Sequence, residues 1–128
     1  MPTPLSHLRI FADDAGESHV DWVELAMKTK MFAPPAPPLD LSEPSPASTF
    51  ALLRLPSQWH GEWHPTPSRQ WLFFLSGAVT MKVSDGTSFE VQAGTAVLLE
   101  DTTGKGHQTT VVGNTEVVIA SVQVPQPQ

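Results

Sequence analysis

Short segments that alternate apolar and polar residues recur along the chain from Thr49 onward. Residues 78–83 carry valine or methionine at every second position, and residues 87–91 alternate in the same way. A period of two is typical of a strand with one buried face. Ser84-Asp85-Gly86 joins the two segments, and Asp-Gly between alternating runs predicts a β-hairpin.

Three further segments have the composition of strands, namely residues 49–55, 69–75 and 116–124. Residues 111–115 precede the last of them and predict a second hairpin turn. Strand segments at intervals of about 8–12 residues, with no convincing helix among them, predict an all-β sandwich or barrel.

The N-terminal third is less regular. Residues 32–46 contain six prolines, which exclude a regular helix or a central strand and favour extended chain. This segment is either a disordered linker or a strap, and the apolar Phe32, Leu39 and Leu41 favour a strap packed on the barrel or on a partner subunit. Residues 20–26 are either a strand or a short helical turn, because the periodicity fits both.

A chain of 128 residues is expected to form one domain. We divide it into an N-terminal extension with the proline-rich strap packed on the barrel (residues 1–48), the barrel itself (residues 49–124) and a loose tail (residues 125–128).

The amino-acid composition limits the classes of partner that we expect for this chain. Seven basic against thirteen acidic residues give a net charge of −6, so a nucleic-acid partner is not expected. No apolar run approaches the roughly 20 residues needed to cross a bilayer, so no membrane partner is expected either. The absence of cysteine and of an apparent signal peptide leads us to expect a cytoplasmic location.

Polar residues that bind metals cluster among the predicted strands. In an extended chain His60, Glu62 and His64 share one face, Gln70 opens the next strand, and His107 follows a glycine-rich corner. Imidazole and carboxylate are ligands that borderline divalent metals prefer. The pattern predicts that several of these side chains converge in one cavity.

These residues resemble the first signature motif of the cupin superfamily, in which two histidines flank one residue and are followed by a glutamate, six residues and a glycine. Gln70 stands six residues before Gly77, at the glutamate position. His64 matches the second histidine, and Glu62 stands where the first would be.

The second cupin motif is matched at its ends by Gly94 and His107. Glu100 lies near the position of the motif's proline, and Val111 replaces its asparagine. The resemblance covers residues 49–124 and implies a small single-domain antiparallel jelly-roll β-barrel.

The resemblance also implies a function. One divalent metal would be bound by His64 and His107 through nitrogen and by Glu62 and Gln70 through oxygen, with Fe(II) favoured over Mn, Ni or Zn. Cupins with such sites include dioxygenases, isomerases and lyases that act on small organic molecules. Glu62 is alternatively a carboxylate that orients a histidine. The competing hypothesis is a metal-free, non-catalytic module that binds a small molecule.

Three residues are candidate acids or bases, namely Glu100, Asp101 and His60. For Asp101 the favoured role is a turn in which its carboxylate caps backbone amides. His60 is expected at the cavity mouth or in solvent, not on the metal. His7 and His19 lie outside the motifs and are expected at the surface.

We also expect a homodimer, because open sheets have edges that must be covered. Residues 20–26 are the element expected to pack or exchange across the two-fold axis.

Overall fold

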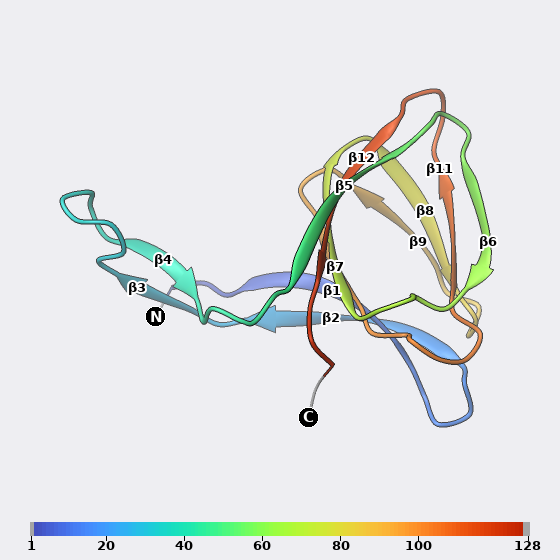
Figure 1. Ribbon diagram of the computed structural model, residues 1–128, viewed down its shortest axis with the longest axis horizontal. Helices are drawn as coiled ribbons and strands as arrows, with labels where there is room; N and C mark the ends of the chain where they lie inside the picture. The colour runs from blue at the N-terminus through green and yellow to red at the C-terminus, as the bar shows by residue number, and fades with distance from the viewer. Residues whose placement is uncertain (1, 127–128) are drawn as a thin grey trace.

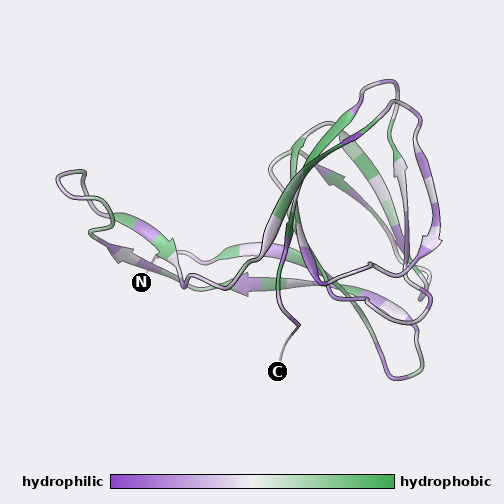
Figure 2. Ribbon diagram, in the orientation of Figure 1, coloured by the Kyte–Doolittle hydropathy of each residue, from purple (hydrophilic) through white to green (hydrophobic). Residues whose placement is uncertain are grey.

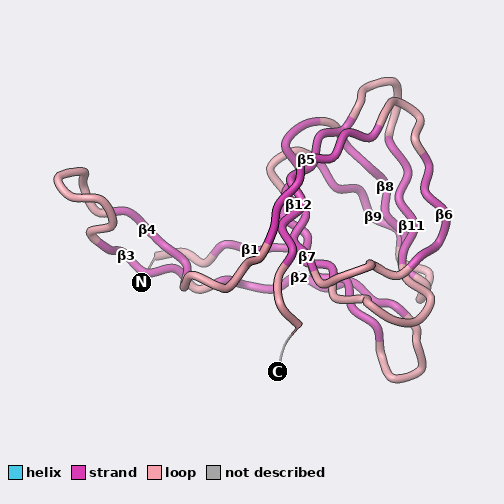
Figure 3. Tube along the Cα trace, viewed as in Figure 1, coloured by secondary structure: helices cyan, strands magenta, loops and turns pink. Residues whose placement is uncertain are grey.

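The computed structural model describes residues 2–126, which form strands and connecting turns with no helix among them (Figures 1 and 3). These residues therefore include no helix that is long and apolar enough to cross a membrane. The all-β prediction is confirmed. The strands are β1 (Leu5–Ala12), β2 (Ser18–Leu25), β3 (Met27–Lys30), β4 (Leu39–Ser42), β5 (Thr49–Leu55), β6 (His60–His64), β7 (Gln70–Ser76), β8 (Ala78–Val83), β9 (Ser88–Gln92), β10 (Ala96–Leu99), β11 (His107–Val111) and β12 (Val117–Gln123).

Two sheets face each other in a jelly-roll arrangement that stays open at its edges (Figure 1). The first has six strands in the order β2-β1-β10-β7-β12-β5, and the second has four in the order β6-β11-β8-β9. Alternate residues of each strand point between the sheets and bury their apolar side chains there. This core includes Ile10, Phe74, Val79, Met81, Val97, Val117 and Ile119.

The predicted hairpin at Ser84-Asp85-Gly86 is confirmed, because β8 pairs antiparallel with β9 across that turn. The second predicted hairpin is wrong. β11 pairs with β6 and β8 in the four-stranded sheet, whereas β12 pairs with β5 and β7 in the six-stranded sheet. The turn residues 112–116 therefore carry the chain from one sheet to the other. A turn sequence specifies a reversal of direction but not the strand that becomes the neighbour.

The N-terminal region differs from the expected extension. β1 and β2 belong to the six-stranded sheet, where β1 pairs parallel with β10 and places Leu8 and Ile10 in the core. Residues 20–26 fall largely within β2, which settles their ambiguity in favour of a strand. Sheet strands therefore begin well before residue 49.

The proline-rich segment does not lie over the barrel as a strap. β3 and β4 pair with each other, and residues 31–38 form the exposed tip of this hairpin arm, which projects away from the two sheets (Figures 1 and 3). Prolines fit the tip because no ladder hydrogen bond is needed there. In the expected loose tail, the Pro125 carbonyl accepts a hydrogen bond from Arg69 at 2.9 Å, and residues 127–128 lie outside the described residues.

Gly106 holds β11 against the end of β6. Its φ is 76°, and a Cβ added there would overlap the backbone carbonyl of His64. At Gly113, with a φ of 71°, an added Cβ would meet nothing within 4 Å. The two glycines share the left-handed conformation and differ in the space around them.

We predict that Gly106→Ala lowers the free energy of unfolding by more than about 3 kcal/mol, because the backbone must shift as well as bear left-handed strain. Gly113→Ala should cost only about 1–2 kcal/mol from the strain alone. Urea unfolding of both variants measures the difference. Equal losses would show that the close approach to His64 contributes nothing.

An ionic cluster ties the loop between β1 and β2 to the turn between β8 and β9. The His19 ring lies 2.8 Å from Asp13 Oδ2 through Nε2 and 2.8 Å from Asp85 Oδ2 through Nδ1. The hydrogen bonds to Asp13 and then Asp85 raise the pKa of His19. The bond from His19 lowers the pKa of Asp13, and bonds from Thr87 and then His19 lower that of Asp85.

These shifts predict a pH window for the cluster. The carboxylates contribute above about pH 4 and His19 contributes fully below about pH 6.5, and its share is lost as pH rises through its raised pKa. The difference in Tm between the wild type and His19→Gln should therefore be larger at pH 5.5 than at pH 9. A difference that stays constant or grows toward pH 9 would contradict the ionic role of His19.

Candidate functional site

A cavity of about 130 Å³ lies between the two sheets. Its polar side is formed by His64, Thr66, Gln70, His107 and Thr109. The rest of its wall is apolar, with side chains that include Leu53, Leu55, Trp59, Leu72, Phe74, Met81, Leu99 and Ile119. An apolar pocket with a few grouped polar side chains is the usual form of a small-molecule site.

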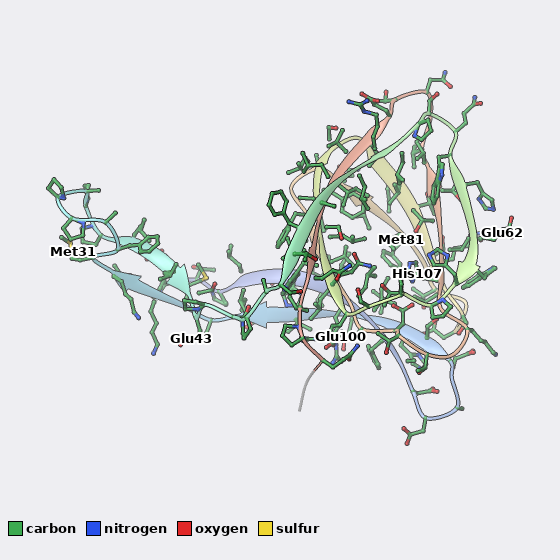
Figure 4. All side chains as sticks on the ribbon, in the orientation of Figure 1. Met31, Glu43, Glu62, Met81, Glu100 and His107 are labelled. Atoms are coloured by element: carbon green, nitrogen blue, oxygen red, sulfur yellow. The ribbon has the colours of Figure 1, made fainter. Side chains whose placement is uncertain are left out.

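His107 begins β11, is 4% exposed, and points into the space between the sheets (Figure 4). Its Nδ1 lies 2.7 Å from Oδ2 of the fully buried Asp101. The carboxylate accepts the Nδ1 proton, which leaves Nε2 as the ring nitrogen available to the cavity. The other oxygen of Asp101, Oδ1, has no hydrogen-bond partner among the described residues.

His64 ends β6 directly opposite His107, and the two ring centroids are 5.0 Å apart. Its Nδ1 donates to the backbone carbonyl of Glu62 at 2.7 Å. A carbonyl oxygen can only accept, so the Nδ1 of His64 carries the proton and Nε2 is left unprotonated in the neutral ring. Within residues 2–126 neither His64 nor His107 uses Nε2 in a hydrogen bond.

Gln70 begins β7 and lines the same cavity as the two histidines. Its Nε2 donates to Thr66 Oγ1 at 2.9 Å, and its Oε1 accepts a hydrogen bond from Ser121. The Thr66 hydroxyl in turn donates to the carbonyl of Ser68 at 2.8 Å. These bonds fix the side-chain amide of Gln70, with its oxygen shared with Ser121.

The expectation that His60, Glu62 and His64 share one face is wrong. His64 pairs with His107 and Gly61 pairs with Thr109, so three steps along β6 match two steps along β11. This bulge reverses the alternation between Glu62 and His64. A glycine inside a strand is one signal of a bulge, and Gly61 carries it here.

The bulge leaves His60 and Glu62 on the outer side of β6. The Glu62 side chain is 85% exposed and lies 3.6 Å from His60, on the far side of the strand from His107 (Figure 4). His60 Nδ1 lies 2.7 Å from Thr110 Oγ1, outside the cavity. The structure therefore brings together His64, Gln70 and His107 and leaves Glu62 apart.

Of the candidate acids and bases, Asp101 is bonded to a residue of the cavity and Glu100 lies apart from the cavity. Asp101 was expected to cap backbone amides, but its carboxylate is bonded to His107 inside the protein. Glu100 forms an ion pair with Arg69 at 2.7 Å and does not line the cavity. Thr66 and Ser121, which hold Gln70, carried no sequence signal because each comes from a different strand or loop.

His7 also differs from its expected surface position. It is 6% exposed and meets the Trp71 ring edge-on at 4.6 Å between centroids. His19 is held by two carboxylates as described above.

The donors at the cavity are two imidazole nitrogens and one neutral amide oxygen. Among residues 2–126 no group of three or more histidine, aspartate or glutamate side chains is placed to hold a metal ion. His64 and His107 are the cavity residues that could ligate an ion through nitrogen.

No protein-family model and no curated protein matches this chain. Among solved structures, the Cnp3 cupin domain of Schizosaccharomyces pombe is 10% identical, with a TM-score of 0.51, over 98% of this chain and 86% of that one. A cupin domain of Bordetella pertussis Tohama I (bp2299) is 13% identical, with a TM-score of 0.46, over 66% of this chain and all of that one. The NMB1881 protein of Neisseria meningitidis is 18% identical, with a TM-score of 0.45, over 59% and 72%.

The Cnp3 domain matches nearly the whole chain in fold. Together with the jelly-roll topology, this match identifies the chain as a small protein of the cupin fold.

Proposed function

We propose that this cupin-fold protein binds one divalent metal ion through Nε2 of His64 and Nε2 of His107, and accepts a small organic molecule beside it. The observation that carries the proposal is the use of both Nδ1 atoms in other hydrogen bonds. Nε2 is then the free nitrogen of each ring, and both rings line the same cavity with their centroids 5.0 Å apart.

His107 is 4% exposed and His64 is exposed, and within residues 2–126 neither Nε2 has a hydrogen-bond partner. A metal ion satisfies both nitrogens at once, and so would a proton donor shared between them. The carboxylate of Asp101 behind His107 favours the metal, because histidines that bind metals usually donate their other N–H to such a group.

The remaining donors define the expected ion. Gln70 can add only a neutral oxygen, which Ser121 already engages, and Glu62 lies on the opposite side of β6. Imidazole ligands suit Fe, Ni and Zn, so these are the candidate ions. Among the described residues, the carboxylate of the usual non-haem Fe(II) ligand set is missing from this cavity, so the donors give Fe(II) no advantage over Ni or Zn. When bound, such an ion polarises an oxygen atom of the ligand.

The cavity limits the ligand. Its volume of about 130 Å³ is below the roughly 300–1,000 Å³ of pockets that hold drug-sized molecules, so the ligand is a small metabolite. Its apolar part would pack against Phe74, Met81 and Ile119, and its oxygen would face the histidines. The polarisation of that oxygen by the ion would favour an enzyme over a passive binder.

We predict that His64→Ala and His107→Ala each lose most of the bound metal, since each removes one of two strong nitrogen donors. His60→Ala is the matched control, because the same residue type on the outer side of β6 should leave the metal content unchanged. Elemental analysis of untagged protein, grown with Fe, Mn, Ni and Zn, measures the result. Wild-type protein without stoichiometric metal under these conditions would overturn the metal proposal.

A metal-free binding module is the second candidate. The observation that favours it is that, within residues 2–126, no aspartate, glutamate or further histidine joins the two histidines to hold a metal ion. In that case a hydroxyl of the ligand would donate to the histidine nitrogens, and the apolar wall would supply most of the affinity.

Gln70→Glu separates the two candidates. If a metal is bound, the new carboxylate should tighten its binding and increase the rise in Tm on adding the metal, because a charged oxygen joins the two nitrogens. If the site is metal-free, the variant should lose about 1–3 kcal/mol, because the Thr66 hydroxyl already donates to Ser68 and cannot pair with the carboxylate. Thermal unfolding with and without each metal distinguishes these outcomes.

A further inference from the structure

The outward side of the six-stranded sheet carries a continuous apolar surface, which we call the outer face. It crosses three neighbouring strands, since Ala120 of β12 pairs with Leu52 of β5 on one side and with Phe73 of β7 on the other. The outer face consists of Phe50, Leu52, Trp71, Phe73, Leu75 and Val122. None of these side chains is charged.

Much of the outer face is open to water. Phe50 is 76% exposed and Leu52 is 66% exposed, although both lie within a regular strand. Beside Trp71 and Phe73 lies a groove of about 340 Å³ that is also lined by Leu5. Contiguous apolar surfaces of this kind usually mark an interaction site.

The hairpin arm is a second surface without cover. Within the described chain, β3 and β4 form a sheet of their own. A two-stranded hairpin is only marginally stable by itself. Met31 and Phe32 at its tip are 58% and 61% exposed, and residues 31–39 carry no charge. The arm therefore needs an apolar surface to pack on.

The arm and the outer face lie at an angle to each other. The arm leaves the barrel on the side where β5, β7 and β12 lie, so the two surfaces border an open corner (Figure 1). Hydrophobic segments occur both on the arm and on β5 and β12 (Figure 2). Within one chain, the barrel covers neither the arm nor the outer face.

We propose that two copies of this chain form a dimer in which the arm of each packs on the outer face of the other. Both uncovered surfaces occur in one chain, so a two-fold axis satisfies both arms and both faces and closes the assembly at two copies. No charge is buried where the uncharged tip meets the uncharged face. The prolines of the tip also limit its conformations before docking, which reduces the entropy lost on binding.

The exchanged element is then the arm and not residues 20–26. β2 is paired along its length with β1 of the same chain. The proline-rich tip would pack on a partner subunit, in place of the strap expected over its own barrel.

Light scattering at micromolar concentration tests the proposal, and the wild type should show twice the chain mass of 13.9 kDa. Leu52→Glu on the outer face and the double variant Met31→Ser, Phe32→Ser on the arm should each weaken dimerisation by about tenfold or more. All three residues are exposed in the single chain, so circular dichroism should show unchanged folding. Val112→Glu, at an exposed apolar residue of the turn between β11 and β12, is the control and should remain a dimer.

Mixing the two variants distinguishes arm exchange from simple contact between faces. A mixed dimer keeps one intact arm on one intact outer face, so mixing Leu52→Glu with the arm variant should restore a dimer at a concentration at which each variant alone is monomeric. A monomeric wild type, a dimer unaffected by either variant, or a mixture that stays monomeric would each overturn the proposal. Mass gained only when another protein is added would assign the outer face to a different partner.

Discussion

The burial of apolar side chains between two facing sheets is the constraint on which the rest of this structure depends. Each strand contributes every second residue to that space, and the two layers together exclude water from the core. The packing is incomplete near β6, β7 and β11, where polar side chains replace apolar ones. The cavity lies there, so the same layer that stabilises the fold also forms the walls of the site.

Within that apolar layer, the buried pair formed by Asp101 and His107 has the largest free-energy cost of burial. A fully buried carboxylate is costly unless it is paired, and one of its oxygens is satisfied by the imidazole while the other is not. Such an arrangement makes sense where a polar group has a task beyond stability. The neighbouring His64, held by its own backbone bond to Glu62, places a second imidazole at the same position.

The outside of the molecule carries apolar surface that the single chain leaves exposed. An apolar sheet face and the uncharged tip of the arm are both exposed in the single chain, although the chain as a whole carries a net charge of −6. Repulsion between like charges elsewhere opposes non-specific association, while the uncharged surfaces remain available for one specific contact. The site between the sheets and the proposed contact on the outer face therefore use opposite sides of the six-stranded sheet.

Much of the local structure was predictable from sequence. The alternation in residues 78–83 and the Asp-Gly turn are local patterns, and they correctly indicated β8, β9 and the hairpin between them. They were sufficient because side-chain direction in a regular strand follows directly from residue spacing. The resemblance to the cupin motifs singled out His64, Gln70 and His107, which line one cavity.

Only the tertiary structure decided which strands become neighbours and in which register. The bulge opposite Thr109 turns Glu62 away from the cavity, the partners of β12 turn an expected hairpin into a crossover, and the pairing of β3 with β4 turns an expected strap into an arm. Strand pairing is set by contacts between residues far apart in the sequence. A single extra residue in one strand reverses every side chain beyond it, and no local pattern records that change.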